Sequence, residues 1–392
     1  MGHTVVVVGA GIGGLAAAVG LRRVGWEVTV VDRSPVHADA GAGISLAANG
    51  LRSLDALGVG AAVRAAGRGQ YTGGTRTPGG SWLTRMDGAA LERAVGSPLL
   101  GIPRSALHRL LRAALPPEAL RPGVTVTAAT PLRRGRVRVD TGPEGEPLEA
   151  DLVVAADGIG SRLRTALHPS HPGPVHSGST VLRAVTARPM DLRTDFELTW
   201  GRGAEFGHIA FPDGRAEWHA VLNAPAGVRH SDPLDVLRRR FGDWHDPIPE
   251  LLAATRPEDV LHHDVAELAT PLPSFVAGRV VLLGDAAHAM TPNLGQGACQ
   301  ALEDAVVLAA RLDGAADVDA ALARYDAERR PRTTAVATAA RRAGRMGQQV
   351  SHPVAVALRN SLLRLAPSGV AVRAIVRHAA WTPPLTRAFA DE

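Results

Sequence analysis

The chain has 392 residues and a formal net charge of +5, and 45% of its residues are hydrophobic. This length is enough for two or three domains with a sizeable core, and no uninterrupted apolar run approaches the ~20 residues that a membrane-spanning helix needs. The 43 basic residues are all arginines, interspersed with 38 acids and forming no long run, which disfavours nucleic-acid binding.

The start of the chain, MGHTVVVV, indicates a strand instead of a basic region followed by an apolar core. We therefore expect no signal peptide, and a cytoplasmic protein. The single cysteine, Cys299, excludes an intramolecular disulfide, and we interpret it as a packing residue at a helix start. A helix amino terminus would lower the pKa of this thiol, but no base is paired with it.

The first elements follow the order strand, glycine turn, helix, strand and acid. Thr4 to Val8 predicts a buried strand, the glycine turn is GAGIGG (Gly9 to Gly14), and Glu27 to Val31 predicts a second strand that ends at Asp32. This order, with the acid about 20 residues beyond the turn, is typical of a dinucleotide-binding unit.

Each glycine of this turn has a physical reason. Gly9 permits the tight turn, Gly11 lets a pyrophosphate approach the backbone, and Gly14 allows the helix to pack closely on the strand. The carboxylate of Asp32 would bind a ribose hydroxyl. The sequence therefore predicts a bound dinucleotide at the amino-terminal end.

Two further segments lie near this unit. Ala40 to Leu57 contains a second glycine-rich turn, GAGI, which is either a ligand contact or a flexible loop. Pro103 to Leu115 predicts an amphipathic helix with Arg104 in its first turn, where a cation opposes the helix dipole. Arg104 is therefore either a ligand for an external anion such as a diphosphate or a solvated surface arginine.

A second acid turn follows a group of short predicted strands. The strands are Val124 to Ala128, Val137 to Asp140 and Leu152 to Ala155, and the last one leads into ADGIGSRLR with Asp157. A third turn follows the buried strand Val280 to Leu283 and carries Gly284 and Asp285. The combination of three such turns is difficult to explain by packing alone.

The segment from Val280 to Asp304 continues through a loop with Pro292 into a helix that opens near Gly297. The exposed N–H groups and the positive end of the helix dipole favour an anion or an electron-rich carbonyl there. Between Ser177 and Leu268 the sequence predicts β-strands with aromatic residues, which indicates an inserted sheet domain and a pocket at the domain junction.

Histidines in this middle region do not form a metal-binding pattern. The candidates are His168, His171 and His176, or His262 with His263; the first group is broken by prolines and has no nearby acid pair or cysteine. We therefore predict no metal site.

The remaining chain predicts three helical stretches, namely Gln300 to Leu312, Val318 to Arg330 and a long arginine-rich tail from Thr333 to the end. Within this tail Val354 to Val376 is amphipathic. It would lie either on a membrane surface or across the domain junction, and the few charges on its polar side favour the junction.

Taken together, GAGIGG, ADGIGSRLR and GDAAHAMTPNLGQG resemble the motifs of the FAD-dependent aromatic hydroxylases, the single-component flavoprotein monooxygenases of the p-hydroxybenzoate and salicylate hydroxylase type. The resemblance covers nearly the whole chain. It implies bound FAD, with cofactor contacts at Gly9, Gly11, Gly13, Gly14, Asp32, Arg33, Gly43, Arg104, Asp157, Gly284, Asp285, Leu294, Gly295 and Gly297. Asp32 stands where many members have glutamate.

The family's pattern also implies a reaction. NAD(P)H would reduce the flavin, O2 would form a flavin C4a-hydroperoxide, and a hydroxyl group would pass to an aromatic or other electron-rich small molecule. Pro292 and Gly295 are the candidates beside the reactive edge of the flavin, and His208 or His219 would take a phenol proton. The candidate substrate contacts are Arg183, His208, Phe211 and Trp218.

Other functions stay open. Urate-type members carry an arginine and a tyrosine where this chain has Glu205 and Glu217, which disfavours urate. The Trp-x-Trp-x-Ile-Pro signature of flavin-dependent halogenases is absent. An FAD-dependent epoxidase, reductase or desaturase of a natural-product intermediate is the alternative, and a non-enzymatic FAD-binding scaffold is disfavoured by the complete loop from Pro292 to Gly297.

The resemblance implies an α/β fold with a Rossmann-like FAD-binding domain of the GR2 type, an inserted β-sheet substrate domain and a helical C-terminus. We expect residues 1–70, 98–176 and 271–345 to form the FAD-binding domain, 71–97 and 177–270 the substrate domain, and 346–392 a C-terminal helical segment. We expect a monomer or homodimer.

Overall fold

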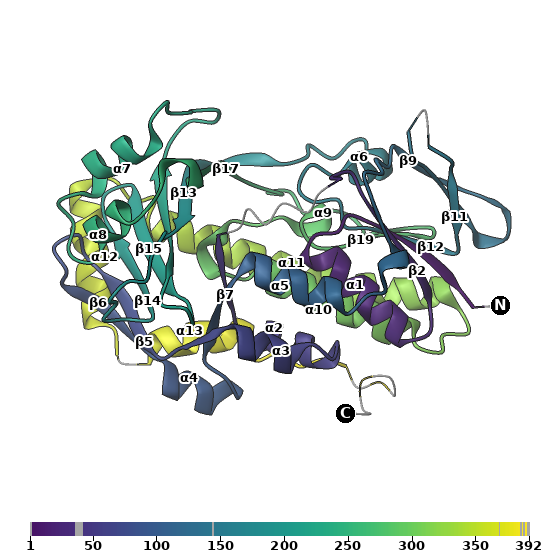
Figure 1. The fold of residues 1–392 in the computed structure, drawn as a ribbon, viewed down its shortest axis with the longest axis horizontal. Helices are drawn as coiled ribbons and strands as arrows, with labels where there is room; N and C mark the ends of the chain where they lie inside the picture. Colours follow the sequence, from purple (N-terminus) through teal and green to yellow (C-terminus); the bar gives the residue numbers. More distant parts are fainter. Residues whose placement is uncertain are drawn as a thin grey trace.

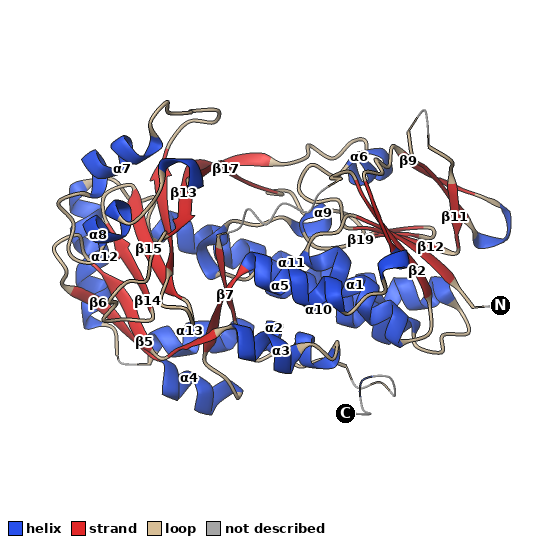
Figure 2. Cartoon of the chain, viewed as in Figure 1, coloured by secondary structure: helices blue, strands red, loops and turns tan. Residues whose placement is uncertain are grey.

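The fold was analysed in a computed structural model that describes residues 2–35, 42–142, 145–367, 369–384, 386 and 389. The molecule is elongated, with one large sheet towards each end and long helices running between them (Figures 1 and 2). This arrangement confirms the mixed α/β fold with a Rossmann-like domain, a second β-sheet domain and C-terminal helices.

The first sheet has six strands. Their order is β18 (Val276–Ala277), β19 (Val280–Leu282), β12 (Leu152–Ala155), β1 (Thr4–Val8), β2 (Glu27–Asp32) and β8 (Leu120–Pro122). Neighbouring strands are parallel except for β18 and β19. The central strands are continuous apolar runs because both faces of a parallel sheet are covered.

Helices pack beside this sheet to form the main core. Helix α1 (Ile12–Arg23) packs along α10 (Gly297–Leu312), and α10 also contacts α2 (Ala48–Ala56) and α11 (Val318–Met346). A small antiparallel sheet of β9 (Ala128–Pro131), β10 (Val137–Asp140) and β11 (Leu148–Ala150) lies at the far end of the domain.

The second large sheet has seven strands and lies at the other end of the molecule (Figure 2). Its order is β17 (Leu261–Glu267), β13 (Val175–Val185), β16 (Ala216–Asn223), β15 (Ala204–Ala210), β14 (Phe196–Trp200), β5 (Thr72–Arg76) and β6 (Trp82–Asp87). One face packs on α7 (Pro233–Phe241) and α8 (Ile248–Ala253) through a second core that includes Phe206, Trp218 and Phe241.

A three-stranded sheet connects the two ends. It contains β3 (Gly43–Leu46), β7 (Leu99–Pro103) and β4 (Arg68–Gln70), and β3 contacts β15 and β16 of the large sheet. Around it lie α3 (Gly60–Ala66), α4 (Gly88–Val95) and α5 (Arg104–Ala113). The remaining helices are α6 (Arg162–Leu167), α9 (Asp285–His288), α12 (Pro353–Leu365) and α13 (Val370–Ala379).

Short 3-10 turns complete the set: η1 (Pro117–Ala119), η2 (Arg133–Gly135), η3 (Pro257–Asp259) and η4 (Pro292–Leu294). Two predicted boundaries differ substantially from the structure. The strand predicted at Val124 to Ala128 begins only at Ala128, in β9. The helix predicted to end at Arg330 continues through Pro331 to Met346, because buried residues on both sides of the proline hold it in place.

The C-terminal helices differ in how they pack. Helix α13 contacts α2, α4 and β6, as the predicted position across the domain junction requires. Helix α12 contacts β6, but most of its side chains are exposed. None of the described helices combines the length and apolar character that a membrane span requires.

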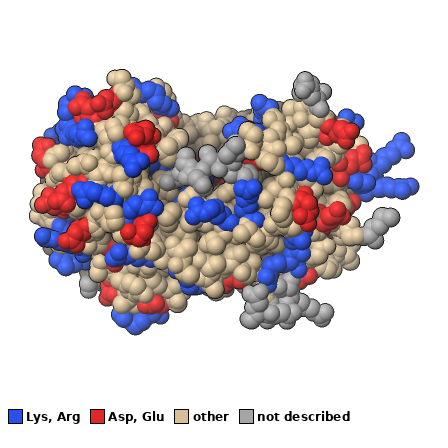
Figure 3. Space-filling view, in the orientation of Figure 1, with Lys and Arg blue, Asp and Glu red and all other residues tan. Residues whose placement is uncertain are grey.

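On the face drawn in Figure 3, basic and acidic side chains are interspersed. The predicted turn residue Gly41 lies outside the described residues.

Candidate active site

The glycine turn after β1 lies directly against the end of β12. Gly9 has a positive φ of 107°, and a Cβ atom there would lie 2.3 Å from the Ala156 carbonyl oxygen. A Cβ at Gly14 would lie 1.9 Å from the Gly9 carbonyl oxygen. At Gly11 a Cβ would meet nothing within 4 Å. Gly9 and Gly14 are therefore required by the fold itself, whereas Gly11 faces open space that a ligand can approach.

Asp32, at the end of β2, holds this turn in place. Its Oδ2 accepts a hydrogen bond of 2.7 Å from Ala10 N, and its Oδ1 accepts one of 2.8 Å from Ser34 N. Gly11 is the N-cap of α1, no side chain caps the helix, and no acid lies in its first turn. The amino terminus of α1 thus presents free N–H groups and an uncompensated positive dipole end, which is a suitable site for a diphosphate.

Three strand ends meet at this edge of the sheet because β1, β12 and β19 are parallel neighbours. Asp157 follows β12 and accepts a hydrogen bond of 3.0 Å from Arg162 N, while its buried Oδ1 has no partner among the described residues. Asp285 follows β19, begins α9 and is exposed. Ligands of open α/β sheets bind at such carboxyl ends.

The loop before α10 exposes its backbone. Gly295 adopts a left-handed conformation with φ 61°, and a Cβ at Gly295 or Gly297 would meet nothing within 4 Å. Helix α10 begins at Gly297 with no acid in its first turn and no side-chain cap. Its amino-terminal N–H groups therefore remain available to an electron-rich group.

A cavity of about 640 Å³ joins this loop to the second sheet. On the Rossmann side it is lined by the catalytic candidate Pro292 and by predicted cofactor residues, namely Gly11, Gly13, Gly43, Arg104, Gly284, Asp285, Leu294, Gly295 and Gly297. The opposite wall includes Arg183 and His219. Gly9, Gly14, Asp32, Arg33 and Asp157 do not line the cavity, although the neighbours Ala156 and Gly158 do.

The alternation of side chains along the strands explains which sheet residues reach the cavity. On β15 Glu205 and Ile209 line it, and on β16 Glu217, His219 and Val221 do. His208 and Trp218 lie on the opposite face of these strands. The His208 ring lies 3.2 Å from Thr194 Oγ1, and Trp218 Nε1 donates to Thr255 Oγ1 at 2.7 Å. Phe211 follows β15 and is fully buried outside the cavity lining.

Two glutamates that were not predicted as site residues flank His219. His219 Nδ1 lies 3.3 Å from Glu217 Oε2, and His219 Nε2 lies 3.8 Å from Glu205 Oε1. Burial lowers the pKa of His219, but the two carboxylates outweigh burial and the net pKa is raised. Burial raises the pKa of Glu205, whose Oε2 also accepts a bond of 2.5 Å from Trp200 Nε1.

Arg183 completes this polar wall. Its guanidinium lines the cavity and makes no hydrogen bond or ion pair with any described residue. Burial lowers its pKa, and the charge of Glu217 opposes this effect. We define Arg183, Glu205, Glu217 and His219 as the polar wall. A half-buried guanidinium at a cavity wall, with no hydrogen bond to a described residue, can bind an oxygen atom of a ligand.

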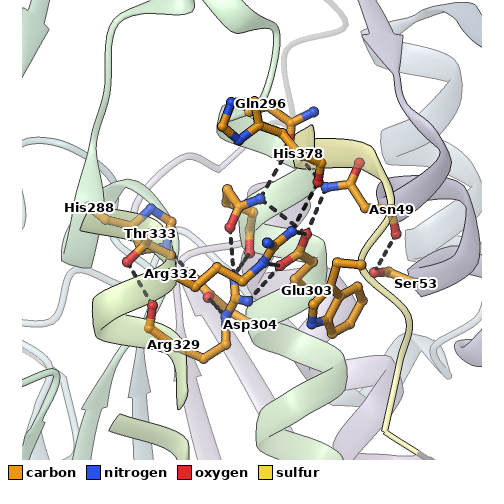
Figure 4. Close-up of polar contacts among 12 residues, drawn as sticks. Asn49, Ser53, His288, Gln296, Glu303, Asp304, Arg329, Arg332, Thr333 and His378 are labelled. Carbon is orange, nitrogen blue, oxygen red and sulfur yellow. Dashed lines mark hydrogen bonds and ion pairs between the residues drawn. The ribbon is translucent and has the colours of Figure 1, made fainter. Parts of the chain in front are cut away.

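A buried polar network, also not predicted from the sequence, supports the cofactor side of the cavity (Figure 4). Asp304 of α10 accepts through Oδ2 from Gly284 N at 3.0 Å, and the same oxygen lies 2.5 Å from His288 Nε2. Arg329 of α11 donates to Asp304 and, at 2.5 Å, to Glu303. Burial would raise the pKa of Asp304, but His288 and Arg329 lower it to about 2.

The same network reaches the loop before α10. Asn49 Nδ2 donates to Gln296 Oε1 at 2.9 Å and to Glu303 Oε1 at 2.7 Å, and Arg332 also donates to Glu303. Gln296 is the N-cap of α10 and lines the cavity. The network therefore fixes both the Gly284 turn and the start of α10. The sequence signal for this network was the pair of adjacent acids, Glu303 and Asp304, in the largely apolar helix α10.

Cys299 is fully buried, and burial raises the pKa of its thiol to about 12. Burial thus outweighs any effect of the helix start, and the residue packs against Gly50. Within the described ranges there is no group of three or more His, Cys, Asp or Glu side chains that could hold a metal ion.

Comparisons with known proteins agree with this geometry. A family model described as FAD binding domain matches residues 3–340. The chain is 38% identical over 370 residues to aurachin C monooxygenase/isomerase of Stigmatella aurantiaca, covering 94% of this chain and 95% of that one. It is 35% identical to 2-heptyl-3-hydroxy-4(1H)-quinolone synthase of Pseudomonas aeruginosa, covering 93% and 94%.

Among solved structures, HpxO of Klebsiella pneumoniae in complex with FAD and uric acid is similar to this chain. The TM-score is 0.89 with 27% sequence identity, and the alignment covers 96% of each chain.

Proposed function

Because the chain belongs to the family of FAD-dependent aromatic hydroxylases, we propose that it uses NAD(P)H and O2 to hydroxylate an electron-rich ring compound in the cavity between its two large sheets. The chain is an FAD-dependent monooxygenase. We propose the identity of its reductant and the chemical class of its substrate. The observation that carries the proposal is the continuity of the cavity from the glycine-rich loop before α10 to the polar wall.

The residues at the sheet edge fit FAD. Gly11 leaves room where a Cβ would meet nothing, and the uncapped α1 presents N–H groups for the diphosphate. We assign Asp32 to the adenosine ribose, with Arg33 beside it. Asp285 and Arg104 line the cavity and suit the ribityl and phosphate groups. Asp157 lies at the neighbouring strand end.

When bound, FAD supplies the redox chemistry: it accepts a hydride from NAD(P)H and, once reduced, activates O2. The protein supplies the electrostatic environment for that chemistry. Helix α10 has no acid in its first turn, so its positive end stabilises negative charge on a ring placed against Gly295 and Gly297. Pro292 and Leu294 close this side of the cavity.

The polar wall determines how a substrate is oriented. The two carboxylates favour the protonated form of His219, so His219 and Arg183 both present N–H donors to the cavity. Glu217 offers an acceptor beside them. A ring that carries an oxygen acceptor next to an N–H or O–H donor satisfies these groups, as a hydroxy-, amino- or oxo-substituted aromatic or heteroaromatic compound does. The relative from Pseudomonas aeruginosa is named for a product of this chemical kind.

This proposal differs from a urate oxidation. The neighbouring structure of HpxO contains uric acid, but the wall of this chain presents the carboxylates of Glu205 and Glu217. Carboxylates disfavour an oxygen-rich anion such as urate. We therefore infer a less oxygen-rich ring as the substrate.

We infer that residues 1–70, 98–176 and 271–345 hold the cofactor and that 71–97 and 177–270 recognise the substrate. We also infer that the reaction takes place in the cytoplasm, where reduced nicotinamide is available, and that the protein works as a monomer or homodimer.

The test is a panel of hydroxy-, amino- and oxo-substituted aromatic and heteroaromatic compounds. Purified protein should be yellow and release FAD on denaturation. A panel member should stimulate the oxidation of NADH or NADPH and yield a product heavier by one oxygen atom. A colourless protein that takes up no FAD contradicts the assignment of the cofactor site. Stimulated oxidation that yields only hydrogen peroxide with every compound contradicts the proposed substrate class.

A further inference from the structure

Helix α12 has its apolar side chains facing outwards. Val354, Leu358, Leu362 and Leu365 recur every three or four residues and therefore share one face, yet each is 60–81% exposed. The residue of α12 that is buried is an arginine: Arg359 Nη1 donates to the Gly347 carbonyl at 2.7 Å. A surface helix of a globular protein normally has the opposite arrangement.

Exposed apolar residues at the neighbouring helix ends extend this face. Met346 ends α11 and is 67% exposed, and Val370 begins α13 and is 38% exposed. We define Met346, Val354, Leu358, Leu362, Leu365 and Val370 as the α12 patch. The other large apolar side chains exposed among the described residues, Tyr71, Leu132 and Val175, lie in separate segments. A row of large exposed apolar side chains along one helix face marks an interaction site.

The chain that carries most of the α12 patch is rich in arginine. From Arg329 to Ala390 the sequence contains eleven arginines and no aspartate or glutamate. From the end of α11 through α13, the exposed arginines are Arg342, Arg345, Arg364, Arg373 and Arg377. The elements that α12 and α13 contact carry the acids Asp55, Asp87 and Glu92, and each has a local partner: Asp55 pairs with Arg64, Asp87 caps α4, and Glu92 lies 3.3 Å from the Tyr71 hydroxyl.

From this combination of apolar and cationic groups we infer that the α12 patch is a docking surface for an anionic phospholipid bilayer. A leucine-bearing helix face with flanking arginines binds the interface of such a bilayer by both burial and charge. A second copy of the chain fits less well. A two-fold contact would bring the same arginines together, and the segment has no acid to pair with them.

The position of α13 gives this docking a consequence for the cavity. Ala371, Ala374, Ile375 and His378 of α13 line the cavity, and α13 directly follows the α12 patch. A molecule docked through α12 therefore holds one wall of its cavity beside the lipid. This consequence depends on the proposed function, whereas the docking itself does not.

The test is co-sedimentation of the FAD-loaded full chain with vesicles of phosphatidylglycerol and phosphatidylcholine, compared with phosphatidylcholine alone. We expect the protein to sediment with the anionic vesicles, and the bound fraction to fall with added salt. The double variant Leu358→Ser/Leu362→Ser should lower the affinity at least tenfold. Arg364→Gln/Arg373→Gln should lower it for anionic vesicles and reduce its salt dependence.

The matched control is Leu132→Ser/Arg133→Gln, which makes the same chemical changes at exposed positions near β9, at the opposite end of the molecule (Figure 1). It should bind anionic vesicles like the wild type. FAD content and the melting temperature of every variant should match the wild type, because the altered side chains are exposed.

Two results would overturn the inference. One is the absence of wild-type binding to anionic vesicles. The other is a wild-type dimer, seen by sedimentation velocity, that the Leu358→Ser/Leu362→Ser variant loses without any change in vesicle binding; the patch would then be an interface between two copies. Because vesicle binding is measured without turnover, failure of the hydroxylation test leaves this result unaffected.

Discussion

Arg329 of α11 donates through Nε to Asp304 Oδ1 of α10 at 2.6 Å, and both side chains are fully buried. The second oxygen of Asp304, Oδ2, accepts a hydrogen bond from Gly284 N and lies 2.5 Å from His288 Nε2. One carboxylate therefore connects the helix that opens at the cavity with the turn that carries Asp285.

This relationship predicts a large effect of Asp304→Asn. The change leaves a buried guanidinium with less compensating charge, so we expect the free energy of unfolding to fall by about 3–5 kcal/mol. FAD should also be released more readily, because the Gly284 turn loses its anchor. Urea unfolding and FAD dissociation measure the two effects. As a control, Asp319→Asn removes an exposed partner of Arg279 and should cost less than about 1 kcal/mol. Equal unfolding of both variants would contradict the role of the network.

The pKa of Asp304 predicts how this effect depends on pH. The folded-state pKa of about 2 is below the ordinary value of 3.8, so the carboxylate stabilises the fold fully above about pH 4. Its contribution, on the order of 2 kcal/mol, is lost as the pH falls from 4 to 2. The stability difference between the wild type and Asp304→Asn should therefore narrow in this range by about 2 kcal/mol. A stability difference that stays constant from pH 7 to pH 2 would rule this out.

The glycine turn predicts two different kinds of defect. Gly14→Ala places a Cβ 1.9 Å from the Gly9 carbonyl oxygen, so the protein should fold poorly. Gly11→Ala meets no atom of the protein and should leave the melting temperature of the FAD-free protein unchanged while FAD affinity falls at least tenfold. Thermal melts and FAD titration separate the two defects. Gly79→Ala, also without a clash, is the control for both. Unchanged FAD affinity in Gly11→Ala would remove the diphosphate assignment.

The polar wall predicts that two histidines of neighbouring strands behave differently. His219→Gln removes a cavity donor and should lower substrate-stimulated NAD(P)H oxidation about 100-fold with FAD content unchanged. His208→Gln alters the opposite face of the sheet and should have little effect on this rate. The wild-type rate should also fall as the pH rises through the raised pKa of His219, because the donor proton is lost. Equal losses in both variants would show that the strand faces are misassigned.

Burial predicts the chemistry of Cys299. A thiol that is fully buried, with its pKa raised to about 12, should not react with Ellman's reagent at pH 8 in the folded protein. One equivalent should react after unfolding in urea. Fast reaction in the folded state would show that the start of α10 opens.

The sequence predicted the local backbone features on one side of the cavity, and their roles in cofactor binding stay predictions. The turn from Gly9 to Gly14, the acid at Asp32 and the loop from Pro292 to Gly297 were found because each depends on backbone geometry within a few residues. Arg104 was found for a similar local reason, since a cation at a helix amino terminus opposes the dipole. The structure places Arg104 in the cavity wall.

The substrate side was predicted less well. Alternation along a strand predicts that neighbouring side chains of β15 and β16 point to opposite faces of the sheet. It does not predict which of the two faces, the one with His208 or the one with His219, meets the cavity. That choice depends on α7 and α8, which cover the face with His208 and Trp218. Glu205 and Glu217 became wall residues for the same reason.

The sequence by itself determined the local turns, the strand ends and the amphipathic character of the helices, because these follow from short-range sterics and periodicity. Only the tertiary structure decided that Arg329 meets Asp304 25 residues earlier, that α11 continues through Pro331, and that α12 buries Arg359 and exposes its leucines. Those features depend on which surfaces meet after the chain has folded, and burial then determines which charges are paired and which side chains stay exposed.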